Sequence, residues 1–194
     1  MHISYSQGRY QLSTQNAIYS FGDLYTNYFR AFKQIDLDKY AIKNVLILGF
    51  GLGSIPLMLE NNFDKNYKYT GIEIDEEVIY LANKYVVDEL KSFIEIICID
   101  AFAFANSCQE KFDLICVDLF LDDVIPEIFQ QQDFLRTINN LLSPKGILLY
   151  NRLAQTKKDK KASTTFFRKQ FLSVFPKGNY IDVDGNWMFT NLKI

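Results

Sequence analysis

Histidine is nearly absent from this chain, whose 194 residues include one histidine, His2, close to the N-terminus. A Ser-His-Asp triad, a histidine-ligated zinc site and a Cys-His pair all need histidine among other reactive groups, so this scarcity argues against all three. Only three cysteines are present, and none forms a C-x-x-C pair. Cys98 and Cys116 lie in apolar runs, where we expect both thiols to pack as small hydrophobic groups. Any catalysis is therefore expected to use carboxylates, hydroxyls, backbone groups and positioning, without a metal.

The chain also lacks an excess of basic charge and any long apolar segment. Its 21 Lys and Arg residues against 23 Asp and Glu residues give a formal net charge of −2, unlike the basic balance of a nucleic-acid-binding protein. No apolar run approaches the length that spans a bilayer, and residues 1–5 lack the layout of a signal peptide. The basic run 157–161 is interpreted as a solvated loop, because it lacks interleaved aromatic residues. We therefore expect a cytoplasmic protein that binds neither a membrane nor nucleic acid.

Apolar residues, by contrast, are plentiful: 48% of the chain is hydrophobic, including 17 Phe and 12 Tyr. This is enough to build a large core within one main domain. Strand-type runs alternate with amphipathic, helix-type segments, and such alternation predicts a mainly parallel sheet with helices on both faces. Two final runs around Asp184-Gly185 predict a hairpin. The predicted fold class is α/β, a three-layer sandwich with a seven-stranded, mostly parallel sheet closed by an antiparallel C-terminal hairpin.

The limits of the elements follow from changes of periodicity and from turn residues. The predicted strands are the run before the glycines at 49–53, then 67–74, 93–99, 112–117, 147–151, 180–183 and 187–192. The predicted helices begin after Ser54 and Asp75, which are both expected to act as caps, and further helices cover about 102–106, 129–141 and 164–174. Residues 1–40 interrupt the alternation and predict a small N-terminal extension of short strands and one helix, beside a main domain over 41–194.

In sheets of this kind, ligands bind beyond the carboxyl ends of the strands, and four of the predicted strands end in glycine or an acid. The first ends in Gly49–Gly53, whose glycines let a ligand approach the backbone closely. The second ends in Glu73, 20 residues after Gly53, a spacing at which a carboxylate can accept hydrogen bonds from ribose hydroxyls. The third and fourth end in Asp100 and Asp118. Together these acids predict a negative crevice that favours a cationic ligand, such as a sulfonium donor or an amine.

A dinucleotide-binding domain of the NAD type shares the glycines and the acid, but it requires the pattern G-x-G-x-x-G/A. Counted from Gly49, the last position of the pattern is Ser54, and counted from Gly51 it is Pro56. Neither residue fits, and a closing hairpin is not typical of that fold. The sequence therefore disfavours an NAD-binding domain.

Five segments, in their order along the chain, resemble successive motifs of the spermidine synthase branch of class I S-adenosylmethionine-dependent methyltransferase-fold enzymes. They are Asn44–Ser54, Gly71–Asp75, Asp100–Phe102, Phe112–Phe120 and Ser143–Asn151. The resemblance covers roughly residues 40–155. It implies a Rossmann-like, class I methyltransferase fold, with S-adenosylmethionine or its decarboxylated form as co-substrate. It also implies a small-molecule acceptor such as an amine, and it is the only ground for expecting a homodimer.

The resemblance assigns six residues to the donor: Gly49, Gly51, Gly53, Glu73, Asp100 and Ala101. The glycines would border the amino-acid and ribose portion of the donor, and the glutamate would hold the ribose hydroxyls. The aspartate would accept a hydrogen bond from the exocyclic amine of adenine, with the alanine backbone beside the ring.

A second group of residues would meet the acceptor. Asp118 matches the acid beside the reacting amine, where it would orient and deprotonate the attacking nitrogen as the catalytic residue. Spermidine synthases carry another acid three positions later; here that position is Leu121, and the next acids begin at Asp122. The nearest counterpart of their Tyr-His-Glu segment is Tyr-Thr-Asn at 25–27. We expect Asp118, Asp122 and Tyr25 to contact the acceptor.

Three functions remain open at the level of the sequence. The first is methyl transfer from S-adenosylmethionine to a small nucleophile, an in-line displacement in which the protein supplies proximity and alignment. The second is aminopropyl transfer from decarboxylated S-adenosylmethionine, as in spermidine synthases. The third is a non-catalytic nucleotide-binding or partner module, which the altered acid and Tyr-His-Glu positions bring into consideration.

Overall fold

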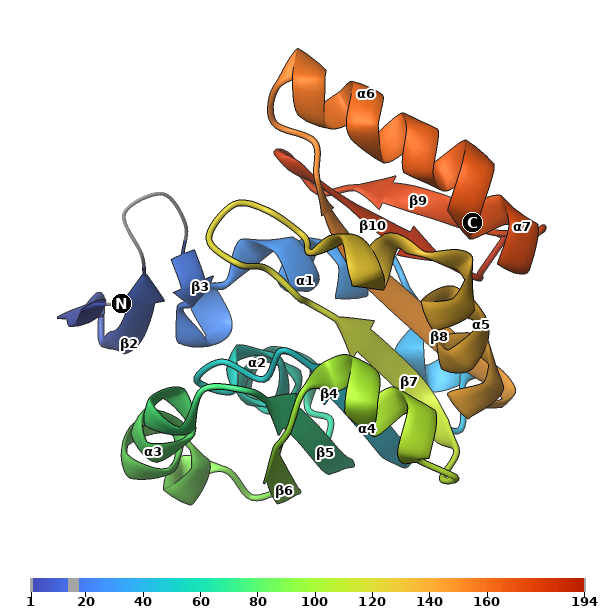
Figure 1. Cartoon of the computed structure of the whole chain (residues 1–194). Coiled ribbons are helices and arrows are strands. Elements are labelled where there is room, and N and C mark those ends of the chain that lie inside the picture. Colours follow the sequence, from blue (N-terminus) through green and yellow to red (C-terminus); the bar gives the residue numbers. More distant parts are fainter. Residues whose placement is uncertain (1, 14–17, 194) are drawn as a thin grey trace.

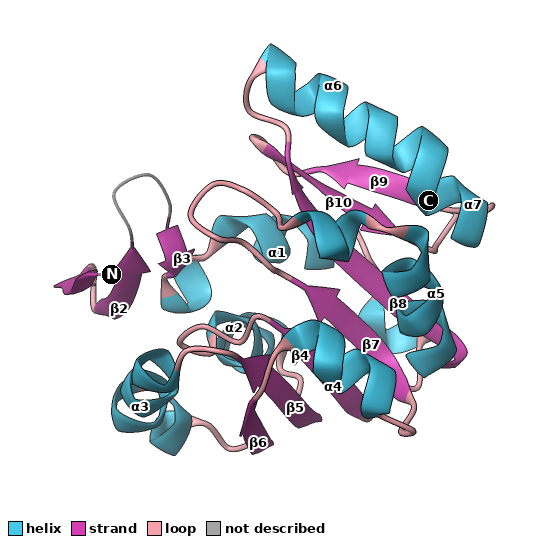
Figure 2. Ribbon diagram, in the orientation of Figure 1, coloured by secondary structure: helices cyan, strands magenta, loops and turns pink. Residues whose placement is uncertain are grey.

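A seven-stranded sheet forms the centre of the computed structural model, which describes residues 2–13 and 18–193 (Figure 1, Figure 2). The strand order is β6-β5-β4-β7-β8-β10-β9. Neighbours from β6 to β8 are parallel, whereas β10 is antiparallel to both β8 and β9. The strands are β4 (Asn44–Leu48), β5 (Lys68–Glu73), β6 (Phe93–Cys98), β7 (Phe112–Val117), β8 (Leu142–Leu153), β9 (Asn179–Asp182) and β10 (Asn186–Thr190). The predicted sheet and its closing hairpin are confirmed.

Helices cover both faces of this sheet and complete the predicted three-layer sandwich. One face carries α1 (Thr26–Phe32), α2 (Ser54–Phe63) and α3 (Glu76–Tyr85). The other carries α4 (Ala101–Ser107), α5 (Gln132–Leu141) and α6 (Lys157–Phe166), which continues through the π-helical turn η5 (Phe167–Phe171) into α7 (Leu172–Val174). Short 3-10 helices are η1 (Gly22–Leu24), η2 (Leu37–Lys39), η3 (Val87–Glu89) and η4 (Glu127–Gln130).

The central strand β4 explains why its sequence is a continuous apolar run. Val45 and Ile47 pack into the core on the α2 face, and Leu46 and Leu48 pack into the core on the α5 face. All four side chains are fully buried, and burying each contributes about 1.5–3 kcal/mol. Because β4 is covered on both faces, its carboxyl end lies in the middle of the molecule, between the ends of β5 and β7.

The helix that follows β4 begins differently from the prediction. Ser54 is the first residue of α2 rather than its cap, and Gly53 is the cap residue, with a φ of +82°. The Ser54 hydroxyl instead accepts a hydrogen bond from the Phe21 backbone N–H at 3.0 Å and shares another with Ser20. Asp75 does cap α3, because its carboxylate accepts from the backbone N–H groups of the helix's first turn.

The segment 155–163 is a further difference, because most of it is helical and α6 begins at Lys157 rather than near residue 164. Thr156 and Asp159 form a reciprocal capping box, in which each side chain accepts a hydrogen bond from the other residue's backbone N–H. Two orphan donors at the helix start are thereby satisfied. The basic run 157–161 therefore belongs to the first turns of a helix, and the loop interpretation was wrong.

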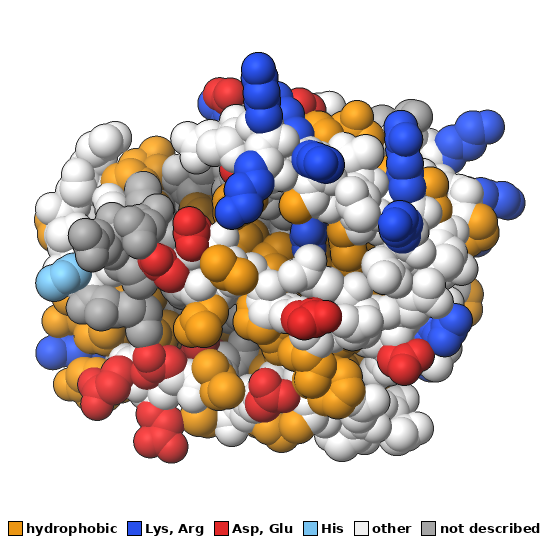
Figure 3. Space-filling view, turned by 45° about the horizontal axis from the view of Figure 1, so that its top comes forward, with side chains coloured by type: hydrophobic (Ala, Val, Ile, Leu, Met, Phe, Trp, Pro, Cys, Tyr) orange, Lys and Arg blue, Asp and Glu red, His pale blue; other side chains and the backbone are white. Residues whose placement is uncertain are grey.

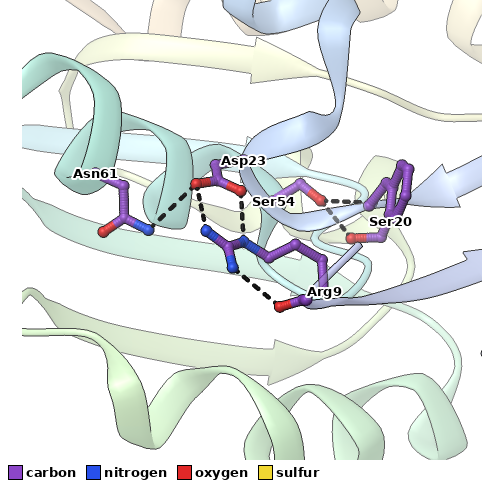
Figure 4. A network of polar contacts seen from close by, with 7 residues as sticks. Arg9, Ser20, Asp23, Ser54 and Asn61 are labelled. Atoms are coloured by element: carbon purple, nitrogen blue, oxygen red, sulfur yellow. Dashed lines mark hydrogen bonds and ion pairs between the residues drawn. The ribbon is translucent and has the colours of Figure 1, made fainter. Parts of the chain in front are cut away.

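The N-terminal residues form a separate three-stranded antiparallel sheet, consisting of β1 (His2–Ser6), β2 (Arg9–Ser13) and β3 (Ile18–Ser20). Arg9 binds Asp23 through two hydrogen bonds, one of them 2.9 Å from Nη2, and Asp23 also accepts from Asn61 on α2 (Figure 4). These contacts attach the small sheet to α2 of the main sandwich. The division into an extension over 1–40 and a domain over 41–194 stays a prediction.

The two cysteines expected to be buried differ in their surroundings. Cys116 on the central strand β7 is fully buried, as expected, and burial raises the pKa of its thiol. Cys98 is exposed, because β6 is an edge strand and Cys98 is its last residue. The prediction that Cys98 packs as a core residue was therefore wrong.

Candidate active site

The glycine turn after β4 brings two strand ends into close contact. Gly49 has a φ of +86°, a conformation that favours glycine. A Cβ at Gly49 would fall well inside van der Waals contact of the Asp118 backbone carbonyl. The Asp118 N–H in turn donates to the Leu48 carbonyl at 2.8 Å. Only glycine therefore lets the end of β7 lie against the turn.

Glu73, the last residue of β5, holds this turn from the other side. Its Oε2 accepts a hydrogen bond of 3.0 Å from the Gly51 N–H, and its Oε1 accepts from the N–H groups of Ile74 and Asp75 at 2.9 and 3.2 Å. The half-buried carboxylate is thus fixed in orientation. A carboxylate has about four lone-pair positions, so this one keeps the capacity to accept a hydrogen bond from a ligand.

Asp100 lies one strand further along, at the start of α4. Its Oδ1 accepts from the Ala103 N–H at 2.9 Å, which makes Asp100 the cap of α4 and places Ala101 at the first helical position. The capping bond uses one oxygen of the carboxylate. The other oxygen is left for a donor such as an amine.

These residues line one cavity of about 300 Å³. Its lining comprises Gly49, Gly51, Ile72, Glu73, Ile74, Val78, Ile99, Asp100, Ala101, Asp118, Leu119, Phe120, Leu121, Pro126, Ile128 and Phe129. We call it the donor-side cavity. None of these lining residues is Lys, Arg or His, so its charged groups are all carboxylates. Gly53 is not among them, and a Cβ at this position would face Phe50 and Val86.

Asp118, directly after β7, is held by a chain of amide side chains. Asn151 Nδ2 donates to Asp118 Oδ1 at 2.8 Å, and Asn186 Nδ2 donates to Asn151 Oδ1 at 2.8 Å. Asn151 is 1% exposed, so its orientation is set by these two bonds. Sequence reasoning noted Asn151 at a strand end but missed Asn186, which the antiparallel pairing of β10 with β8 brings to the site.

Burial raises the pKa of Asp118 from its ordinary value to about 6, although hydrogen bonds from Asn151 and Tyr25 act in the opposite direction. Burial also raises the pKa of Tyr25 well above its usual range, and the nearby negative charge of Asp118 adds to this effect. Tyr25 therefore stays protonated near neutral pH and can donate to Asp118. A carboxylate with a pKa near 6 is suited to accept a proton at neutral pH.

A second cavity, of about 550 Å³, lies on the other side of Asp118. Its lining comprises Phe21, Leu24, Tyr25, Thr26, Asn27, Asp118, Phe120, Asp122, Asp123, Asn151, Leu153, Gln155, Thr156, Lys158, Asp159 and Asn186. We call it the acceptor-side cavity. It contains four carboxylates and one lysine, so its lining is negative. Asp118 and Phe120 line both cavities, which therefore meet at the end of β7.

The tight turn after Asp118 separates Leu121 from the acids that follow it. Leu121 and Val124 exchange backbone hydrogen bonds of 2.8 and 3.1 Å, and Asp122 at the turn has a φ of +58°. Leu121 lines the donor-side cavity, whereas Asp122 and Asp123 line the acceptor-side cavity. The one-position shift seen in the sequence thus leaves two carboxylates at the acceptor-side cavity.

Within residues 2–13 and 18–193, no group of three or more His, Cys, Asp or Glu side chains is arranged to hold a metal ion. No helix in that same part of the chain has both the length and the apolar character needed to cross a bilayer.

Comparison with known proteins identifies relatives of this chain. A family model described as the spermine/spermidine synthase domain matches residues 31–181. A probable polyamine aminopropyl transferase of Bifidobacterium longum is 28% identical over 141 residues, covering 73% of this chain and 31% of that protein. An eEF1A lysine and N-terminal methyltransferase homolog of Drosophila pseudoobscura is 24% identical over 141 residues, covering 68% and 21%. The chain thus spans less than half the length of these relatives.

Two solved structures resemble most of this chain. A probable spermidine synthase from Corynebacterium glutamicum has a TM-score of 0.78 at 16% identity, covering 97% of this chain and 75% of that one. Human methyltransferase-like protein 13 has a TM-score of 0.64 at 20% identity, covering 77% and 71%. At these identities the likeness shows the fold, and the fold is the class I methyltransferase type.

Proposed function

This chain belongs to the spermine/spermidine synthase domain family, and from that premise we propose that it transfers an aminopropyl group from decarboxylated S-adenosylmethionine to a small amine. The observation that carries the proposal is the meeting of two cavities at one carboxylate. Asp118 lines both the donor-side and the acceptor-side cavity. A group that passes from one ligand to the other would cross at this residue.

The donor-side residues support binding of an adenosyl sulfonium compound. Glu73 is oriented to accept hydrogen bonds from ribose hydroxyls, and Asp100 has an oxygen left for the adenine amine. The turn at Gly49 leaves no side chain between the ligand and the strand end. The carboxylates of this cavity favour the positive sulfonium.

The reaction itself is a displacement at carbon. The amine nitrogen donates its lone pair to the aminopropyl carbon bonded to the sulfonium, the carbon–sulfur bond breaks, and its electron pair stays on sulfur. The nitrogen then carries an extra proton, which Asp118 accepts. Asn151 and Tyr25 orient the carboxylate for this step through their hydrogen bonds. Because sulfonium is already a good leaving group, alignment and proton acceptance are the protein's main contributions.

Two observations favour aminopropyl over methyl transfer, which the sequence alone placed first. The donor-side lining includes no basic side chain to neutralise the carboxylate that S-adenosylmethionine carries. The acceptor-side lining includes four carboxylates, which suit an acceptor with more than one positive charge. The match to the spermine/spermidine synthase family adds to this preference. Methyl transfer is the second candidate, because methyltransferases are also among the relatives.

The test compares two donors in the same assay. Purified protein is incubated with linear diamines and with either decarboxylated or intact S-adenosylmethionine, and products are identified by mass spectrometry. Aminopropyl transfer gives 5′-methylthioadenosine and an aminopropylated amine, whereas methyl transfer gives S-adenosylhomocysteine and a methylated amine. D118N serves as the matched control and is expected to bind the donor but form no product. If the wild type binds either donor without forming any product, the chain is a binding module and the proposal fails.

A further inference from the structure

The basic run 157–161 contributes to one wall of a groove that is separate from the two cavities described above. Three lysines lie along one side of this helix: Lys158 and Lys161 on α6, and Lys169 on η5. Lys161 follows Lys158 by three residues, and Lys169 follows Lys161 by eight, so the three side chains share one face. The groove has a volume of about 510 Å³ and is lined by Glu127, Gln130, Gln131, Lys158, Lys161, Ala162, Thr165, Phe166, Lys169 and Gln170. Figure 3 shows basic side chains gathered over the upper part of the molecule, where α6 lies, with most of the acidic ones to the left and below.

A buried cation lies beneath this groove. The Arg152 side chain belongs to β8, is 5% exposed, and donates from Nη1 to Gln130 Oε1 at 2.9 Å. Its guanidinium carbon lies 4.3 Å from the centre of the Phe166 ring. Both contacted residues line the groove. Arg152 Nε is buried without a hydrogen-bond partner, and no carboxylate in the described part of the chain forms an ion pair with it.

A buried guanidinium is normally matched by an anion, because removing its charge from water is unfavourable. Burial lowers the pKa of Arg152 accordingly, and the nearby Tyr150 hydroxyl only partly offsets the effect. The groove above it has three lysines against the single acid Glu127. The groove is therefore positive, and Glu127 alone does not balance its lysines together with the cation beneath them.

The spacing of the lysines indicates the kind of anion. Lys161 and Lys169 are separated by eight residues, which is about 12 Å along a helix. A single carboxylate cannot reach both ends of such a row, whereas a linked series of phosphates can contact several lysines at once. We propose that this groove binds a small polyphosphate-bearing molecule, whose phosphates contact the lysines of the groove, while Arg152, behind Gln130 and Phe166, adds to the positive potential. This inference does not depend on the transferase proposal.

The test uses the single tryptophan of the chain as a reporter. Trp187 pairs with Arg152 across the β8–β10 ladder, so its fluorescence is expected to respond to a ligand nearby. The purified chain is titrated with inorganic tripolyphosphate, with isothermal calorimetry as a second readout. We expect saturable binding that is stronger than that of inorganic phosphate, because the longer anion contacts more of the row of lysines.

Two double variants then separate a site from diffuse attraction. K161Q/K169Q removes two groove charges and is expected to weaken tripolyphosphate binding about tenfold or more. K177Q/K193Q removes two exposed charges outside the groove and is expected to change the affinity for tripolyphosphate less than about twofold. Lys158 is left intact because it also lines the acceptor-side cavity.

R152Q tests the buried cation, with circular dichroism to verify that the variant folds. R152Q is expected to weaken tripolyphosphate binding as K161Q/K169Q does. If R152Q does not fold, the result for K161Q/K169Q decides whether the groove is the binding site. Equal weakening by both double variants, or the absence of saturable binding by the wild type, would overturn the proposal.

Discussion

Asn151 Nδ2 donates a hydrogen bond of 2.8 Å to Asp118 Oδ1, and this bond joins the ends of β8 and β7 at the point where two cavities meet. Because Asn186 fixes the amide of Asn151 in turn, the carboxylate that lines both cavities is oriented by two residues from the antiparallel part of the sheet. The C-terminal hairpin thus contributes to the site as well as closing the sheet.

The raised pKa of Asp118 predicts how activity depends on pH. Asp118 accepts a proton only when it is ionised, and its pKa in the folded protein is about 6. We expect kcat/KM for amine transfer to rise as the pH increases through about 6 and then to level off, until another group titrates. A pH–rate profile with saturating donor measures this. A profile that is flat between pH 5 and pH 7 would show that Asp118 is not the proton acceptor.

The same pKa predicts that the site lowers the stability of the fold. Protonation of Asp118 is favoured in the folded state, where its pKa is about 6, over the unfolded state, where the ordinary value is 3.8. The folded state therefore loses stability as the pH rises from about 4 to 6, by up to about 3 kcal/mol. D118N removes this loss. We expect it to be inactive yet more stable than the wild type at pH 7, as urea unfolding at pH 4 and pH 7 would reveal.

Replacing Asn186 tests the positioning chain without touching Asp118. In N186A the Asn151 side-chain oxygen loses the N–H donor that fixes the orientation of its amide, so Asn151 can turn this oxygen toward the carboxylate. We expect kcat to fall about tenfold or more and the midpoint of the pH–rate profile to move upward, because a hydrogen bond that stabilises the ionised carboxylate is weakened. N106A, an exposed asparagine on α4, is the control. A loss of stability with an unchanged pH midpoint would assign Asn186 a structural role only.

Much of this arrangement follows from local signals in the sequence. A parallel strand that is buried on both faces has a continuous apolar sequence. A Gly, Glu or Asp that ends such a run is therefore easy to recognise. Because parallel strands end at one edge of the sheet, Glu73, Asp100 and Asp118 could be expected to share a crevice. The cap at Asp75 was equally local, since the carboxylate bonds its own helix.

The features that the sequence did not reveal depend on contacts between distant segments or on weak periodicity. Asn186 reaches the site only through pairing between β10 and β8, which no local pattern specifies. The run of lysines at the start of α6 lacks the apolar periodicity that indicates a helix. The capping box of Thr156 and Asp159 nevertheless marks where α6 begins, and its T-x-x-D pattern could have been recognised in the sequence. The resemblance assigned Gly53 to the donor, and this assignment stays a prediction; in the structure Gly53 is the cap residue of α2.

Gly49 allows a prediction with a matched control. G49A places a methyl group against the Asp118 carbonyl and also strains a backbone with a φ of +86°. Gly8 has a φ of +76° with nothing near its Cβ position, so G8A carries the backbone strain alone, about 1–2 kcal/mol. We expect G49A to lower the unfolding free energy by clearly more than G8A. Donor affinity, measured by calorimetry, should fall only in G49A; equal effects of both variants would mean that the close approach of β7 is unimportant.

Asp122 offers a test of the acceptor-side cavity. Its φ of +58° lies in a region that asparagine tolerates well, so D122N should preserve the turn between Leu121 and Val124 while removing one negative charge from the cavity lining. If the acceptor is a diamine, its KM should rise about tenfold, with kcat less affected, since an attraction present in both the ground and transition states is lost.

The increase in KM caused by D122N should also depend on salt, because the attraction between Asp122 and the amine is electrostatic and is screened as ionic strength increases. The KM of the wild type should therefore approach that of D122N at high salt. D133N, at an exposed position on α5 that pairs with Arg136, makes the same chemical change away from both cavities and should leave the KM unchanged. A KM that responds equally in D122N and D133N would show that the net charge of the protein attracts the amine, and that the acids of the turn after Asp118 do not bind it.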